Sequence, residues 1–162
     1  MALKSDRSTL QTDISFFMNE AATRGGVASI STGGSGVSLD NGAAVVTYGA
    51  VPSGKVPVGV LLNDMVDIDL TRQHLNQHKD EVQKGGKVSL LTKGWVVTNS
   101  LQGTPAAGDL AYLGHSGNIA NSDVSNDDSD GDGSSRVVGR FLSSVDQNGY
   151  AKVFIDLPNT NL

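Results

Sequence analysis

The 162-residue chain contains no cysteine, four prolines and few aromatic residues, which make up 5% of the sequence. The lack of cysteine excludes disulfides and thiolate metal sites. The apolar runs are only a few residues long, so none can span a bilayer, and the N-terminus lacks the apolar core of a secretory signal. Because the twelve Lys and Arg residues are scattered and the net charge is −5, we expect neither a nucleic-acid partner nor an anionic membrane.

The acidic residues are unevenly divided between fifteen Asp and two Glu, and the chain has twenty Gly. Glu is a good helix former, whereas Asp and Gly favour turns. Short segments rich in Val, Ser and Thr lie between these turn residues, as is typical of β-strands. The composition therefore predicts a mainly β fold, a small β-barrel or sandwich built of hairpins.

Three segments are predicted along the chain. Residues 1–26 form an N-terminal arm and a short helix, 27–54 a Gly/Ser-rich segment with one strand, and 55–162 the β-barrel domain. The helix is expected over residues 12–24, where Ile14, Phe17, Met18 and Ala21 follow helical spacing and Gly25-Gly26 supplies a stop.

Turn signals divide the last segment into hairpins. Three are predicted: 87–99 turning at Lys93-Gly94, 109–120 turning at 114–117, and 136–157 turning at Asn148-Gly149. In the final strand, alternation places Ala151, Val153, Ile155 and Leu157 on one face. Residues 71–86 interrupt the strands and are expected at the surface, in a short polar helix.

An acidic stretch, "NDDSDGDGSS" at 126–135, resembles the start of a calcium-binding loop. Asp128, Asp130 and Asp132 match its first three ligand positions, but its twelfth position, a Glu in calcium loops, is Gly139 here. We interpret the stretch as a solvated loop, and a weak structural Ca²⁺ site at these three aspartates is the alternative. No other cofactor is expected.

Other patterns point weakly to chemistry. "GAVPSGKV" (49–56) has phosphate-loop spacing but lacks the Ser or Thr after its lysine, and Pro57 disfavours the required helix. His74 and His78 are spaced as zinc ligands on a helix but have no third ligand. A hydrolase using His115 and a glycan-binding β-sandwich using Trp95, Tyr112 and Tyr150 remain as rival hypotheses. A protein that is not an enzyme is favoured.

Four stretches together resemble the head decoration, or cement, proteins of tailed bacteriophages. They are "VPVGVLLND" (56–64), "GKVSLLTKGWVVTN" (86–99), "PAAGDLAYLGHSGNI" (105–119) and "RVVGRFLSSVDQNGYAKVFI" (136–155). The resemblance covers about the last hundred residues and depends on turn spacing. It transfers no catalytic residues.

The resemblance implies a virion structural protein. Such a protein binds the major capsid protein on the outside of an icosahedral head, often as a homotrimer, and stabilises contacts between capsid subunits. It would be made in the host cytoplasm. This chain departs from the smallest members by its N-terminal segment, its Gly-rich segment and the 71–86 insertion.

Overall fold

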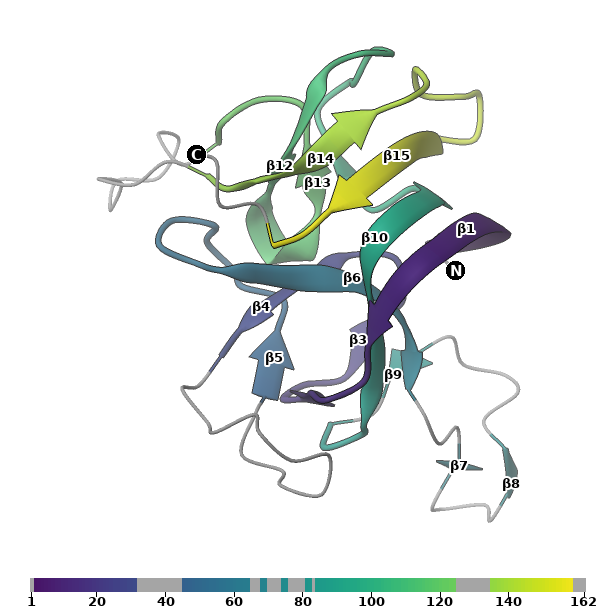
Figure 1. Cartoon of the computed structure of the whole chain (residues 1–162), viewed down its shortest axis with the longest axis vertical. Helices are drawn as coiled ribbons and strands as arrows, with labels where there is room; N and C mark the ends of the chain where they lie inside the picture. Colours follow the sequence, from purple (N-terminus) through teal and green to yellow (C-terminus); the bar gives the residue numbers. More distant parts are fainter. Residues whose placement is uncertain are drawn as a thin grey trace.

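The computed structural model describes residues 2–31, 45–64, 68–69, 74–75, 81–82, 84–124 and 135–158. The described part consists mainly of β-strands, which confirms the mainly β prediction (Figure 1). The elements are β1 (Leu3–Asp13), β2 (Phe17–Met18), β3 (Ala22–Thr23), β4 (Val27–Ile30), β5 (Val45–Thr47), β6 (Pro57–Asp64), β7 (Ile68–Asp69), β8 (His74–Leu75), β9 (Glu81–Val82), β10 (Val88–Thr98), β11 (Leu101–Gln102), β12 (Leu110–Leu113), the 3₁₀ turn η1 (His115–Gly117), β13 (Ile119–Ala120), β14 (Val137–Phe141) and β15 (Ala151–Asp156). Within this part of the chain, no helix has the length and apolar character needed to cross a membrane.

Eleven of the described strands form one sheet, in the order β11-β13-β12-β14-β15-β10-β6-β4-β5-β2, with β1 also paired to β10. β10 organises this sheet because three strands pair with it. β1 runs antiparallel along one side, from Leu3 opposite Thr98 to Asp13 opposite Leu90. On the other side, β15 pairs with residues 93–98 and β6 with residues 88–91. β15 and β6 therefore diverge at Thr92, and the sheet forks there (Figure 1).

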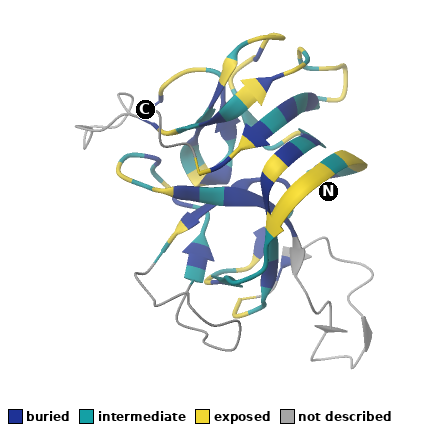
Figure 2. Cartoon of the chain, viewed as in Figure 1, coloured by how far each residue is buried: buried dark blue, intermediate teal, exposed yellow. Residues whose placement is uncertain are grey.

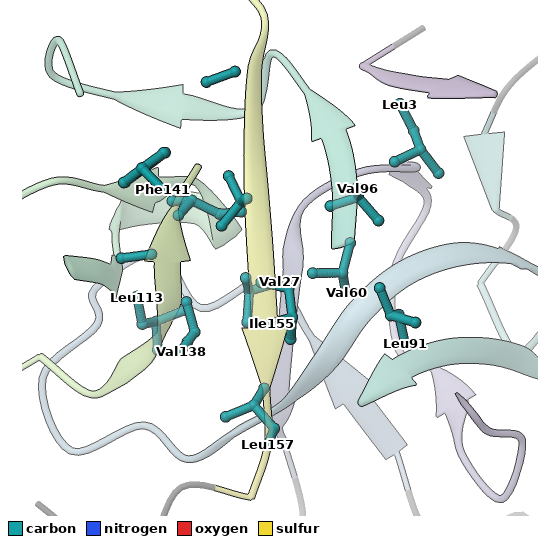
Figure 3. Packing of buried hydrophobic residues seen from close by; sticks show 14 of the residues in the cluster. Leu3, Val27, Val60, Leu91, Val96, Leu113, Val138, Phe141, Ile155 and Leu157 are labelled. Carbon is teal, nitrogen blue, oxygen red and sulfur yellow. The ribbon is translucent and has the colours of Figure 1, made fainter. Parts of the chain in front are cut away.

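Two apolar clusters lie on either side of β6 and the adjoining end of β10. Val60 and Leu91 belong to the larger cluster, which also contains Phe141 and Ile155, whereas their sequence neighbours Leu61 and Leu90 belong to the smaller one. Figure 2 shows these two strands buried along much of their length, and Figure 3 shows the larger cluster. Because successive side chains of a strand point to opposite faces, a strand with a core on both sides needs a continuous apolar run.

The predicted helix over residues 12–24 is wrong. β1 extends to Asp13, and β2 and β3 follow it. The backbone of this segment bonds to distant strands instead of its own turns: the Met18 N–H donates to the Gly86 carbonyl at 2.9 Å, and the Asn19 N–H donates to the Val46 carbonyl at 2.9 Å. Met18 is fully buried in the smaller cluster, whereas Ile14 and Phe17 are half-buried and Ala21 is exposed, so the apolar spacing identified one core residue and not a buried helical face.

The predicted turn at Lys93-Gly94 is also wrong, because β10 continues unbroken through both residues. The two halves of this segment pair with other strands and not with each other. Gly94 has a φ of +143°, and a Cβ there would overlap the carbonyl oxygen of Ser8 on β1. The glycine therefore allows two strands to approach closely.

The other two predicted hairpins are confirmed. β12 and β13 pair antiparallel across η1, and β14 and β15 pair antiparallel across the turn at Asn148-Gly149. The alternation in the final strand is confirmed too, since Ala151, Val153, Ile155 and Leu157 are all buried. Of the 71–86 insertion, only residues 74–75, 81–82 and 84–86 are described; the first two pairs are the strands β8 and β9.

Candidate interaction face

Asp128, Asp130 and Asp132 lie outside the described residues, so the calcium alternative remains a prediction. Within the described ranges, no group of three or more His, Cys, Asp or Glu side chains is placed to hold a metal ion. His78 lies outside these ranges, and of His74 only the backbone is described.

The "GAVPSGKV" segment forms a tight turn before β6, as the sequence predicts. The Lys55 N–H donates to the Pro52 carbonyl at 3.1 Å, and Gly54 has a φ of +68°. A strand begins at Pro57, so the turn has no helix N-terminus after it, the feature with which a phosphate loop completes its anion site.

His115 joins η1 to neighbouring loops. Its backbone N–H donates to the Gln102 side-chain oxygen at 2.9 Å, and its Nδ1 lies 3.2 Å from the Ala50 carbonyl oxygen. The Ser116 N–H donates to the Gly49 carbonyl at 2.8 Å. These contacts are to backbone groups and to the Gln102 side-chain amide, and they hold the turn against its neighbouring loops.

Sequence reasoning missed a polar cluster around Tyr48. Its hydroxyl donates to the Thr23 carbonyl at 2.6 Å and accepts from the Gly26 N–H at 3.2 Å, while Glu20 accepts from the Tyr48 N–H at 2.7 Å. Burial raises the pKa of Tyr48 strongly, the Gly26 bond opposes this rise, and the Glu20 carboxylate adds to it. The cluster holds three segments of the chain together, those around Glu20, Gly26 and Tyr48.

A groove of about 460 Å³ lies beside the fork at Thr92. Its walls are largely apolar and include Phe16, Val58 and Leu157. Among the described residues that line it, only Asp13 is ionisable, and its carboxylate accepts hydrogen bonds from Ser15. A catalytic pocket brings several ionisable groups together, and this groove does not.

A row of exposed and half-buried side chains lies on the outward side of the sheet. Cross-strand partners share one face of a sheet, and register places Leu110 opposite Arg140, Arg140 opposite Phe154, and Phe154 opposite Trp95. This row crosses β12, β14, β15 and β10. We call it, together with Lys152 and Leu142 beside it, the outer face.

Two of the aromatic residues named in the glycan-binding hypothesis lie on this side of the sheet, and each has a lysine ammonium above its ring. The Lys152 Nζ lies 3.6 Å from the centroid of Trp95, and the Lys4 Nζ lies 4.2 Å from the centroid of Tyr150. Such contacts stabilise a cation over a ring by about 0.5–1 kcal/mol at exposed sites. A sugar would have to displace Lys152 to stack on that face of Trp95, so the geometry does not favour the glycan-binding hypothesis.

Ion pairs border the outer face. The Lys4 Nζ lies 3.7 Å from the Asp146 carboxylate, and the Lys93 Nζ lies 3.5 Å from the Asp156 carboxylate. Hydrogen bonding from the Tyr150 N–H is the main cause of a lowered pKa at Asp146, with the Asn148 N–H and Lys4 also lowering it. The turn between β14 and β15 is thereby fixed to β1.

A family model matches residues 4–156 of the chain; it is named Phage_cement and described as "Structural cement protein (E217 gp24/Pam3 gp6)". No curated protein sequence matches the chain. The matched range begins at the second residue of β1 and ends at the last residue of β15, so it includes all of the forked sheet except Leu3.

Proposed function

The chain belongs to the family of phage structural cement proteins, which gives it a structural role in the virion capsid, and from this premise we propose how it acts. It binds the major capsid protein on the outside of an icosahedral head, as a homotrimer, and stabilises contacts between capsid subunits. It performs no catalysis. It is made in the host cytoplasm and ends on the capsid exterior.

The observation that carries this proposal is the family match across nearly the whole sheet. Physical requirements agree with it. A cement protein stabilises a shell by adding contact area across joints, and a standard protein interface buries ~1,600 Å² in total. It needs a stiff surface, because a surface ordered only on binding would lose part of the interaction free energy. The forked sheet with a core on each side of its central strands supplies such a surface.

The N-terminal residues belong to this rigid body. Leu3 is buried in the larger cluster, and Met18 and Ala22 are buried in the smaller one. Deleting residues 1–26 would therefore remove core side chains together with β1. Tests of capsid binding need surface substitutions that leave these residues in place.

Capsid binding is tested by mixing the purified protein with phage capsids from which it has been removed. We expect it to cosediment with the capsids up to a saturating stoichiometry and to raise the temperature at which they disassemble. Sedimentation equilibrium of the free protein should give three times the 16.8 kDa chain mass. Failure to bind capsids would contradict the proposed function, and a monomeric or dimeric mass would contradict the trimer alone.

A further inference from the structure

We propose that the outer face is the surface that docks on the capsid, and that the capsid surface beneath it carries carboxylates around an apolar centre. This inference rests on the proposed function and specifies its site. The capsid partner is identified only by this chemistry, an acidic protein surface.

The first argument is the exposure of apolar side chains on this face. Leu110 is 40% exposed and Leu142 is 46% exposed. Leu110 lies on β12, which pairs with β14 beside Arg140, and Leu142 directly follows the last residue of β14. Phe154 and Trp95 continue the row while half-buried. With neighbouring strands about 4.8 Å apart, the four-strand row is roughly 14 Å wide. Trp, Phe and Arg are the residues enriched at the centres of protein interfaces, where binding energy concentrates.

The second argument is charge. The outer face contains two cations, Arg140 and Lys152, although the chain carries a net charge of −5. Asp156 lies on the same side of β15 as Lys152 and Phe154, and its carboxylate is paired with Lys93. Arg140 is exposed, and no described residue forms an ion pair with it. The neighbouring lysines, Lys4 and Lys93, are each paired with an aspartate. A locally cationic face on an acidic protein orients it toward an acidic partner as the two approach.

The same charges argue against other partners. If two copies met through the outer face about a two-fold axis near Arg140 and Lys152, these cations would approach their own counterparts, and like charges across an interface are unfavourable. In a homotrimer the outer face of one copy would instead meet a different surface of the next, and the mass of an Arg140 variant distinguishes that contact from capsid docking. A nucleic acid needs a larger cluster of cations than these two side chains provide. An acidic protein surface satisfies both the cations and the apolar side chains between them.

The test compares Arg140→Glu with Lys84→Glu in the full chain. Both variants make the same charge change, and Lys84 is exposed in the turn before β10, outside the row of residues that forms the outer face. Binding to stripped capsids is measured by cosedimentation at low and moderate salt. We expect wild-type binding to weaken as salt rises, Arg140→Glu to weaken binding at least tenfold at low salt, and Lys84→Glu to bind like the wild type.

The possible outcomes distinguish a failure of the proposed capsid binding from a failure of the proposed docking surface. If the wild type does not bind capsids, the proposed function fails. If the wild type binds and Arg140→Glu binds equally well, or both variants lose affinity equally, the outer face is not the docking surface. Circular dichroism and sedimentation equilibrium show whether Arg140→Glu keeps the wild-type fold and mass. Loss of self-association in a folded variant would assign the face to a second copy and overturn the inference.

Leu142→Ser provides an uncharged second variant. Leu142 is 46% exposed, so its replacement removes apolar contact area without leaving a cavity in either cluster. We expect weaker capsid binding with little change in its salt dependence. Unchanged binding would show that the apolar part of the face lies outside the contact.

Discussion

Gly139 shows how one missing side chain sets the spacing of two strands. It lies on β14 opposite Ile155 of β15, and a Cβ at this position would overlap the carbonyl oxygen of Phe154. The obstruction is backbone and cannot rotate away as a flexible side chain could. A substitution here must separate the two strands that carry Arg140 and Phe154.

We therefore expect Gly139→Ala to lower the free energy of unfolding by about 3 kcal/mol, the upper part of the usual range for overpacking. Gly149→Ala is the matched control: Gly149 has a φ of +81° and no atom within 4 Å of an added Cβ, so only backbone strain of about 1 kcal/mol is expected. Urea denaturation followed by Trp95 fluorescence measures both. A Gly139→Ala variant as stable as Gly149→Ala would show that β14 and β15 separate without cost.

For single residues, the sequence correctly predicted the features that depend only on neighbouring positions in the chain. The alternation from Ala151 to Leu157 and the turn at Asn148-Gly149 needed only neighbouring residues. The Tyr48 cluster could not be predicted, because its partners come from Glu20, Thr23 and Gly26, more than twenty positions away. The outer face was missed for the same reason, since Arg140 and Trp95 become neighbours of Phe154 only through strand register.

Among the elements, β1 is unusual because it is long but buries little. Of its eleven residues, only Leu3 is buried, and most of the others are exposed. β1 is held mainly by its pairing with β10 and by Leu3 in the larger cluster. Leu3 is buried and Leu10 is exposed on the same strand. Substitutions at the two positions therefore distinguish the contribution of core packing from that of an exposed apolar side chain.

Leu3→Ala should lower the free energy of unfolding by about 2–4 kcal/mol, because it leaves a cavity in the larger cluster. Leu10, 65% exposed, is the control, and Leu10→Ala should change stability by no more than about 0.5 kcal/mol. Thermal and urea unfolding of the two variants measure the difference. Equal stability would mean that β1 is held by backbone pairing alone.

The two wrong predictions about elements share a cause. In residues 12–24 and 87–99, local patterns were sound, since Met18 is buried and Gly94 does adopt a φ that favours glycine. Long-range pairing decided the outcome in both. β2 pairs with β5 and β3 with β9, and β10 pairs with β1 on one side and with β15 and β6 on the other. Tertiary contacts of this kind override local propensity, and no single segment of the sequence records them.

For the whole molecule, the decisive feature is that β6 and β10 contribute side chains to both clusters. Val60 and Leu61 are adjacent in sequence yet belong to different clusters, as do Leu90 and Leu91. Neither core can lose its order without exposing a face of the strands that they share. The described sheet should therefore unfold as one unit.

This cooperativity is tested with one substitution in each core, Phe141→Ala in the larger cluster and Met18→Ala in the smaller. Phe141→Ala should lower the free energy of unfolding by about 3–5 kcal/mol, and Met18→Ala should lower it by about 2–5 kcal/mol. Trp95 fluorescence and far-ultraviolet circular dichroism should report a single shared transition in both variants. Two separate transitions in the Met18 variant would show that the cores unfold independently.

The position of β10 between β1 and β15 also determines when the sheet can be completed during synthesis. Its flanking strands come from residues 3–13 and 151–156, so a ribosome must translate almost all of the chain before the second edge of β10 is covered. Until then, Trp95 and its neighbours present an unpaired edge to the crowded cell, the condition in which nascent β proteins aggregate. Slow translation of the codons that follow Thr98 would prolong that exposure, and rapid synthesis of β15 would shorten it.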